Sequence, residues 1–138
     1  MTTILSSNYK PTAKEKFMNA KQQEYFRQKL DKWRSELLDE ASETRQNLQE
    51  TNVVEADIAD RASTETDRSL ELRTRDRARK LISKIDEALE RIDDGSYGYC
   101  IETDEPIGIQ RLEARPIATL SLEAQERHEK MEKTQRDN

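Results

Sequence analysis

Two stretches of this chain carry residues that recur at steps of four and three, a spacing typical of a coiled-coil seam. The first seam comprises Phe26, Leu30, Trp33, Leu37, Ala41, Thr44 and Leu48. The second comprises Leu70, Thr74, Arg77, Leu81, Ile85, Ala88 and Ile92. Neither glycine nor proline interrupts residues 69–94, so no residue there is a strong helix breaker. The spacing predicts two long helices, the first starting near Thr12, that pack along a narrow seam.

Residues 52–62 interrupt the repeat with β-branched and short acidic side chains, so we expect the chain to reverse there. Two antiparallel helices with an acidic tip then result. A second helix that starts near Arg61 would be roughly 45 Å long, at about 1.5 Å per residue. Such a length holds the tip far from the rest of the chain.

The composition agrees with long solvated helices, because 38% of the 138 residues are charged and only three are glycine and three proline. No apolar run is long enough to cross a membrane, and the N-terminus lacks the features of a secretion signal, so we expect a cytoplasmic protein. One cysteine excludes an internal disulfide. A net charge of -5 argues against nonspecific wrapping of nucleic acid.

After the hairpin, the chain changes character at residues 93–96. Residues 97–101 and 107–110 are short β-prone runs separated by a polar, proline-containing segment, which predicts a small β-hairpin. Ser121 is a candidate N-cap for a last, mostly exposed helix. We therefore predict a mainly α fold with five parts: a flexible arm (1–11), a helical part of the head (12–33), a coiled-coil hairpin (34–92, tip at 52–62), a head resembling a degenerate zinc ribbon (93–120) and a C-terminal helix (121–138).

Two charged features of the hairpin are candidates for function. Asp57 and Asp60 at the tip can hold a magnesium ion or accept hydrogen bonds from a partner, although a solvated helix N-terminus also favours such carboxylates. Farther along, four basic residues at steps of four, three and four share one helix face. This basic stripe can grip a polyphosphate or an acidic protein surface, or can pair with glutamates of the first helix. It consists of Arg73, Arg77, Lys80 and Lys84.

Four positions of the head follow the frame Cys-x2-Cys-x17-Cys-x2-Cys of a zinc ribbon, but three of the four thiolates are absent. The residues at these positions are Cys100, Thr103, Ser121 and Ala124. Two hydroxyls and a methyl group are poor substitutes for thiolates, so we expect no tight zinc site and no other metal. Cys100 is then either a small buried apolar residue or a reactive thiol.

Four segments of the chain are distinctive in their order and spacing: Asp57-Ile58-Ala59-Asp60-Arg61-Ala62, residues 69–77, Tyr97-Gly98-Tyr99-Cys100 and residues 107–116. Taken together, they resemble the DksA/TraR family of bacterial RNA polymerase regulators. The loss of three cysteines resembles the zinc-independent, cysteine-depleted members of that family. The resemblance implies a monomeric, non-enzymatic regulator without sequence-specific DNA binding, whose coiled coil enters the secondary channel of RNA polymerase.

The family resemblance also implies roles for individual residues. The tip residues Asp57, Asp60 and Ala62 would lie near the polymerase active site and alter the stability of open complexes at ribosomal RNA and biosynthetic promoters. Arg73 and Arg77 would contact the rim of the channel. Guanosine tetraphosphate, the effector of the stringent response, would bind at the polymerase interface, where Leu81, Lys84 and Arg115 match family positions.

Gln125 stands at a position where the family commonly has a basic residue, which implies weaker binding of the nucleotide. Two other functions remain open. One is a transcript-cleavage accessory factor of the Gre type, and the other is a coiled-coil adaptor with an inert tip.

Overall fold

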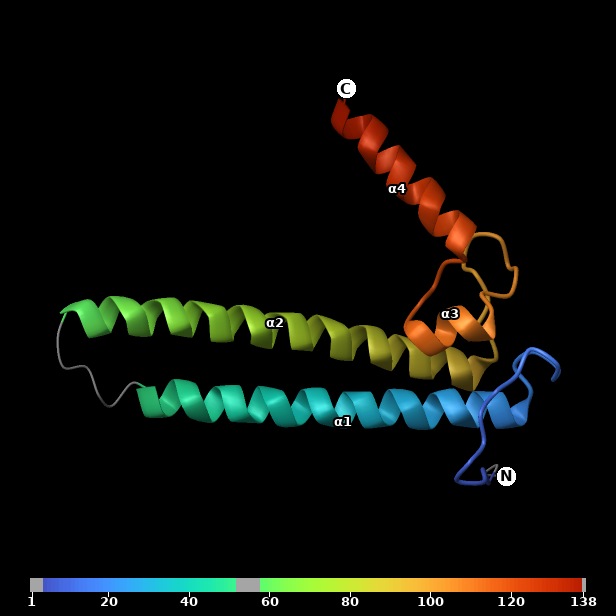
Figure 1. Cartoon of the computed structure of the whole chain (residues 1–138), viewed down its shortest axis with the longest axis horizontal. Coiled ribbons are helices and arrows are strands. Elements are labelled where there is room, and N and C mark those ends of the chain that lie inside the picture. The colour runs from blue at the N-terminus through green and yellow to red at the C-terminus, as the bar shows by residue number, and fades with distance from the viewer. Residues whose placement is uncertain (1–3, 52–57, 138) are drawn as a thin grey trace. The chain divides into compact units, whose positions relative to one another are not determined.

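The computed structural model describes the backbone of residues 4–51 and 58–137, and the side chains of residues 4–43 and 65–135. Its helices are α1 (Ala20–Thr51), α2 (Ile58–Asp94), α3 (Ile109–Ala114) and α4 (Leu122–Asp137) (Figure 1). The predicted mainly α fold is confirmed. The chain divides into two compact units, a hairpin unit (Asp31–Asp86) and a head unit (Met1–Leu30 with Glu87–Asn138).

The hairpin unit consists of the second part of α1 and the first part of α2, which run antiparallel. Leu37 is buried on α1, and Trp33 and Ala41 are half-buried beside it, as the seam predicts. The side chains of Thr44 and Leu48 lie outside the described residues. Arg34 of α1 donates to the Asp86 carboxylate of α2 at 2.7 Å, which ties the two helices together.

The predicted seam of α2 is correct from Leu81 onward, where Ile85 is fully buried, and wrong before it. The residues predicted for the seam but exposed in the structure are Leu70, Thr74 and Arg77. Ala78 is buried instead, seven positions before Ile85, so the buried positions of α2 keep a seven-residue repeat. The predicted seam placed Arg77 at this point, one residue away from that repeat. Burying the methyl group of Ala78 removes no charge from water, whereas the neighbouring Arg77 keeps its guanidinium in water.

In the head unit, α1 begins at Ala20 instead of near Thr12, and residues 12–19 form turns. The Asn19 carboxamide explains the boundary, because its Oδ1 accepts a hydrogen bond from the backbone N–H of Gln22 at 2.9 Å and so caps the helix. The Gln22 side chain is completely buried and accepts from the backbone N–H of Met18 at 2.7 Å. These bonds anchor the N-terminal segment to the start of α1.

The core of the head unit is built from residues that are far apart in the chain. Phe26 and Leu30 of α1 are completely buried, and so is Leu112 of α3. The centre of the Tyr97 ring lies 5.7 Å from the centre of the Phe26 ring, and the Tyr97 hydroxyl donates to the Pro116 carbonyl at 2.7 Å. The N-terminal segment adds Phe17, whose ring packs edge-on against Tyr99. Aromatic packing therefore holds much of the head together.

The predicted β-hairpin of the head is reduced, among the described residues, to one isolated antiparallel bridge between Tyr99 and Pro106. The run 107–110 is not a strand, because Gly108 turns the chain at φ 103° and α3 starts at Ile109. A short apolar run does not distinguish strand from helix by its spacing, which is why the pattern misled the prediction.

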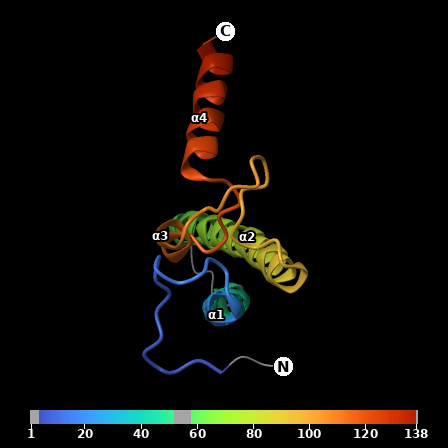
Figure 2. The ribbon, with the colours of Figure 1, turned by 90° about the vertical axis from the view of Figure 1, so that its right-hand side faces the viewer.

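Within the head unit, the last helix, α4, points away from α3 (Figure 1, Figure 2). Residues 126–135 are all exposed, as the sequence predicted. Among the described residues, no helix combines the length and the apolar character needed to span a membrane.

Candidate functional site

The tip of the hairpin holds three of the predicted site residues. Asp57 lies outside the described residues. Asp60 and Ala62 belong to the first turns of α2, which begins at Ile58, but their side chains also lie outside the described set. The first turn of a helix favours a carboxylate through the helix dipole. The predicted roles of these three residues therefore stay predictions.

The basic stripe lies on the surface of α2, since all four of its residues are exposed: Arg73, Arg77, Lys80 and Lys84. Leu81, which the family resemblance assigns to the nucleotide site, is half-buried on the same helix. Four cations at helical spacing on one exposed face can bind an anionic ligand or an acidic protein surface.

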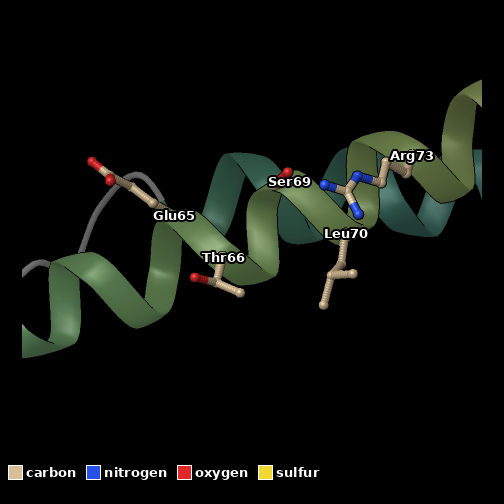
Figure 3. Close-up of a pocket in the computed structure, with 5 residues that line it drawn as sticks. All are labelled: Glu65, Thr66, Ser69, Leu70 and Arg73. Carbon is tan, nitrogen blue, oxygen red and sulfur yellow. The ribbon is translucent and has the colours of Figure 1, made fainter.

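The middle of α2 combines these cations with exposed apolar side chains. Leu70 is 53% exposed and Leu72 is 45% exposed. A shallow hollow of about 500 Å³ lies here, and Figure 3 shows Glu65, Ser69 and Arg73 along one side of α2, with Thr66 and Leu70 pointing to another side. Leucines flanked by arginine suit a protein partner better than a small molecule, because protein interfaces combine an apolar centre with a polar rim.

Cys100, the first position of the zinc-ribbon frame, is only 1% exposed. Burial raises the pKa of its thiol, but hydrogen bonds from the Thr103 hydroxyl and from the backbone N–H groups of Ser121, Glu102 and Thr103 outweigh burial and lower it to about 6. The structure therefore brings Cys100 together with Thr103 and Ser121, whose hydrogen bonds favour the thiolate form of this buried sulfur.

Two other positions of the zinc-ribbon frame, Ser121 and Ala124, contribute to helix capping and to the core. Ser121 caps α4 as predicted, because its Oγ accepts a hydrogen bond from the backbone N–H of Ala124 at 3.2 Å. Ala124 is completely buried and offers no ligand atom. Among the described residues, no group of three or more His, Cys, Asp or Glu side chains converges. One thiolate, two hydroxyls and a methyl group do not fit a structural zinc ion, which takes four N, O or S ligands.

Arg115 is exposed at the end of α3, and its backbone is held on both sides. It is the C-cap residue of α3, with φ −143° and ψ 87°, and its N–H donates to the Arg111 carbonyl at 2.8 Å. On its C-terminal side, the N–H of Ala118 donates to the Arg115 carbonyl at 3.0 Å. The next residue, Pro116, accepts the hydroxyl of buried Tyr97. The backbone from which the guanidinium projects is therefore well ordered.

A polar cluster that the sequence analysis did not identify lies two residues before Arg115. Lys29 of α1 donates to the Glu113 carboxylate at 2.7 Å and to the Glu113 backbone carbonyl at 3.0 Å. Partial burial raises the pKa of Glu113, but hydrogen bonds from Lys29 and Tyr25 lower it below the usual value. Lys29 and Glu113 are 84 positions apart, so no local pattern indicates that they meet.

Comparison with known proteins identifies the chain. Residues 22–92 match the family model described as the N-terminal domain of DnaK suppressor protein DksA, and residues 95–130 match the prokaryotic dksA/traR C4-type zinc finger. The chain belongs to the DksA family. The family resemblance inferred from the sequence is thereby confirmed. The second match spans all four frame positions, of which this DksA family member keeps a single cysteine.

Individual DksA proteins match along nearly the whole chain. The RNA polymerase-binding transcription factor DksA of Caulobacter vibrioides is 64% identical over 135 residues, which cover 98% of this chain and 95% of that protein. The protein of the same name from Escherichia coli K12 is 44% identical over 115 residues, covering 83% and 76%. The structure of transcription factor DksA2 from Pseudomonas aeruginosa superposes with a TM-score of 0.79 at 46% identity, covering 85% of this chain and 90% of that one.

Proposed function

We propose that this protein is a non-enzymatic, cytoplasmic transcription regulator that binds bacterial RNA polymerase as a monomer and does not recognise a DNA sequence. One observation carries the proposal: the 64% identity, over 98% of the chain, to a protein named RNA polymerase-binding transcription factor DksA. The exposed leucines and arginines in the middle of α2 support it, because they suit a protein partner.

In the proposed complex, the hairpin enters the secondary channel of the polymerase. Arg73 and Arg77 contact the rim, where their exposed guanidinium groups form charge-assisted hydrogen bonds with acidic residues of the enzyme. Asp57, Asp60 and Ala62 act near the active site and change the stability of open complexes at ribosomal RNA and biosynthetic promoters. The rim contacts supply affinity, and the tip supplies the regulatory effect.

The proposal includes guanosine tetraphosphate as an effector at the polymerase interface, with Leu81, Lys84 and Arg115 on the side of this protein. Exposed Lys84 and Arg115 have the chemistry to bind phosphate groups, and the ordered backbone of Arg115 favours a defined guanidinium position. Gln125 supplies no positive charge, so the nucleotide response is weaker than with a basic residue at that position.

We further propose that the protein acts without zinc. The donor set of Cys100, Thr103, Ser121 and Ala124 supports this, and so do the aromatic contacts and backbone hydrogen bonds that join the parts of the head. The Ile101 N–H, for example, donates to the Thr119 carbonyl at 2.9 Å, next to the frame.

Charge removal at the tip tests the proposed function. Asp57→Asn and Asp60→Asn keep side-chain size and hydrogen-bonding capacity while removing the negative charge. We expect both variants, Asp60→Asn more strongly, to lose inhibition of a ribosomal RNA promoter while still competing with the parent for polymerase. Asp39→Asn, which removes one charge from an exposed position of α1, is the matched control and keeps full inhibition.

The same experiment separates the alternative functions. A cleavage factor of the Gre type would stimulate magnesium-dependent cleavage in backtracked complexes, and the tip variants would lose that activity. An adaptor would tolerate both substitutions. Full promoter inhibition by the Asp57→Asn, Asp60→Asn double variant contradicts the proposed mechanism.

A further inference from the structure

The cluster of Lys29 and Glu113 has features that a simple surface ion pair lacks. Lys29 contacts Glu113 twice, through the carboxylate and through the backbone carbonyl. That carbonyl belongs to the last turn of α3, where carbonyl groups have no partner within the helix. Lys29 therefore supplies both a counter-ion and a C-terminal cap to a helix of only 6 residues.

The position of this cap relative to Arg115 gives it a functional consequence. Arg115 follows Glu113 by two residues, so the contact of Lys29 with Glu113 holds the segment that leads directly into a cation proposed to bind a polyphosphate. Lys29 pairs with the Glu113 carboxylate at 2.7 Å, and its Nζ also lies 5.9 Å from the centre of the Tyr25 ring. The ring further limits the orientations open to the ammonium group.

We infer that Lys29 is a positioning residue for the anionic nucleotide: it holds the end of α3, from which the chain continues to Arg115, so that Arg115 presents its guanidinium to the phosphate groups. This inference rests on the proposed role of Arg115 and deepens it by adding the residue that supports that role. Lys29 itself need not touch the nucleotide.

Two substitutions that break the same ion pair distinguish positioning from simple structural support. Lys29→Met removes the cap of α3 together with the ammonium group that pairs with the Glu113 carboxylate. Glu113→Gln also breaks the ion pair, but it removes the negative charge and leaves the contact of Lys29 with the backbone carbonyl in place. Positioning predicts a weaker nucleotide response for Lys29→Met and a response no weaker than that of the parent for Glu113→Gln, whereas a structural role of the ion pair predicts similar losses for both.

The assay measures the concentration of guanosine tetraphosphate that gives half-maximal additional inhibition of a ribosomal RNA promoter, with polymerase saturated by each variant. We expect Lys29→Met to raise this concentration about three- to tenfold, the range set by the loss of one ordinary hydrogen bond. Lys29→Arg keeps the charge and the donors and retains the parental response. Glu113→Gln leaves the response unchanged or strengthens it.

Lys21→Met, at an exposed position of α1 in the same unit, is the control and leaves the response unchanged. Both partners of the ion pair are 35% exposed, so its loss has little effect on folding, and near-ultraviolet circular dichroism checks each variant. If Lys29→Met does not fold, a response of Glu113→Gln weaker than that of the parent overturns the inference.

Arg115→Ala separates the inference from the function on which it rests. A weakened response with Arg115→Ala, but a parental response with Lys29→Met, overturns the positioning role and leaves the nucleotide site intact. Equal losses for Lys29→Met and Glu113→Gln also overturn it, because they indicate structural support. A parental response with Arg115→Ala shows that the proposed nucleotide site itself is wrong, and the positioning role falls with it.

Discussion

Replacing Gly98 by alanine tests how firmly the N-terminal segment is packed on a head that has no zinc ligand set. Gly98 has φ +91°, and a Cβ atom there would lie 3.0 Å from Met18 Cγ and 3.2 Å from both Met18 Sδ and Phe17 Cζ. Gly95 provides a matched control, because it has φ +86° but no atom within 4 Å of the same Cβ position. Both substitutions place an alanine at positive φ and incur the same free-energy cost for it, but only Gly98→Ala adds a steric overlap with neighbouring side chains.

The expected magnitudes follow from this comparison. Alanine in the left-handed region costs about 1–2 kcal/mol, which is the whole effect expected for Gly95→Ala. Gly98→Ala adds overpacking against Met18 and Phe17, which costs about 1–3 kcal/mol more. Met18 is a flexible side chain, so the Gly98→Ala, Met18→Ala double variant should recover part of the overpacking term in a double-mutant cycle.

Urea unfolding followed by near-ultraviolet circular dichroism measures these differences, because the tyrosines of the head report on its packing. The free energy of unfolding should decrease more for Gly98→Ala than for Gly95→Ala, with similar m-values. Equal losses for the two variants would refute the reasoning, because they would mean that residues 17 and 18 do not pack against Gly98 in solution.

Three further predictions concern the head and the nucleotide. Purified protein should contain no stoichiometric zinc and keep its melting temperature in a strong chelator, and about one zinc per chain by elemental analysis would contradict the metal-free head. The thiolate absorbance of Cys100 should titrate near pH 6, below the usual thiol pKa of about 8.5. The lowered pKa contributes folding stability that is fully present above about pH 8.5 and is lost as the pH falls through 6. Cys100→Ser should abolish the absorbance step and leave polymerase regulation intact. Lys84→Ala and Arg115→Ala should each weaken the nucleotide-dependent part of promoter inhibition more than the nucleotide-independent part, and Gln125→Lys should strengthen the response. Equal nucleotide responses of the Lys84→Ala, Arg115→Ala double variant and the parent would exclude the assigned residues.

The sequence alone determined the helical hairpin, because helix periodicity is a local property of neighbouring residues. The repeat that includes Leu37 and Ile85 predicted two long helices, and both positions are buried. Ser121 likewise predicted the start of α4, since an N-cap acts only on the next few residues. The family motifs indicated Arg115 as a candidate phosphate ligand in the same way, by residue type and order.

Tertiary structure decided the features that depend on partners distant in the chain. The burial of Ala78 in place of Arg77 follows from the packing of two helices, and the spacing of one helix does not determine it. The support of Arg115 by Lys29 requires α1 to meet the end of α3, and 84 residues separate Lys29 from Glu113. Hydrogen bonds and burial act over a few ångströms in space at any separation in the chain, so only the folded structure shows that Lys29 and Glu113 meet.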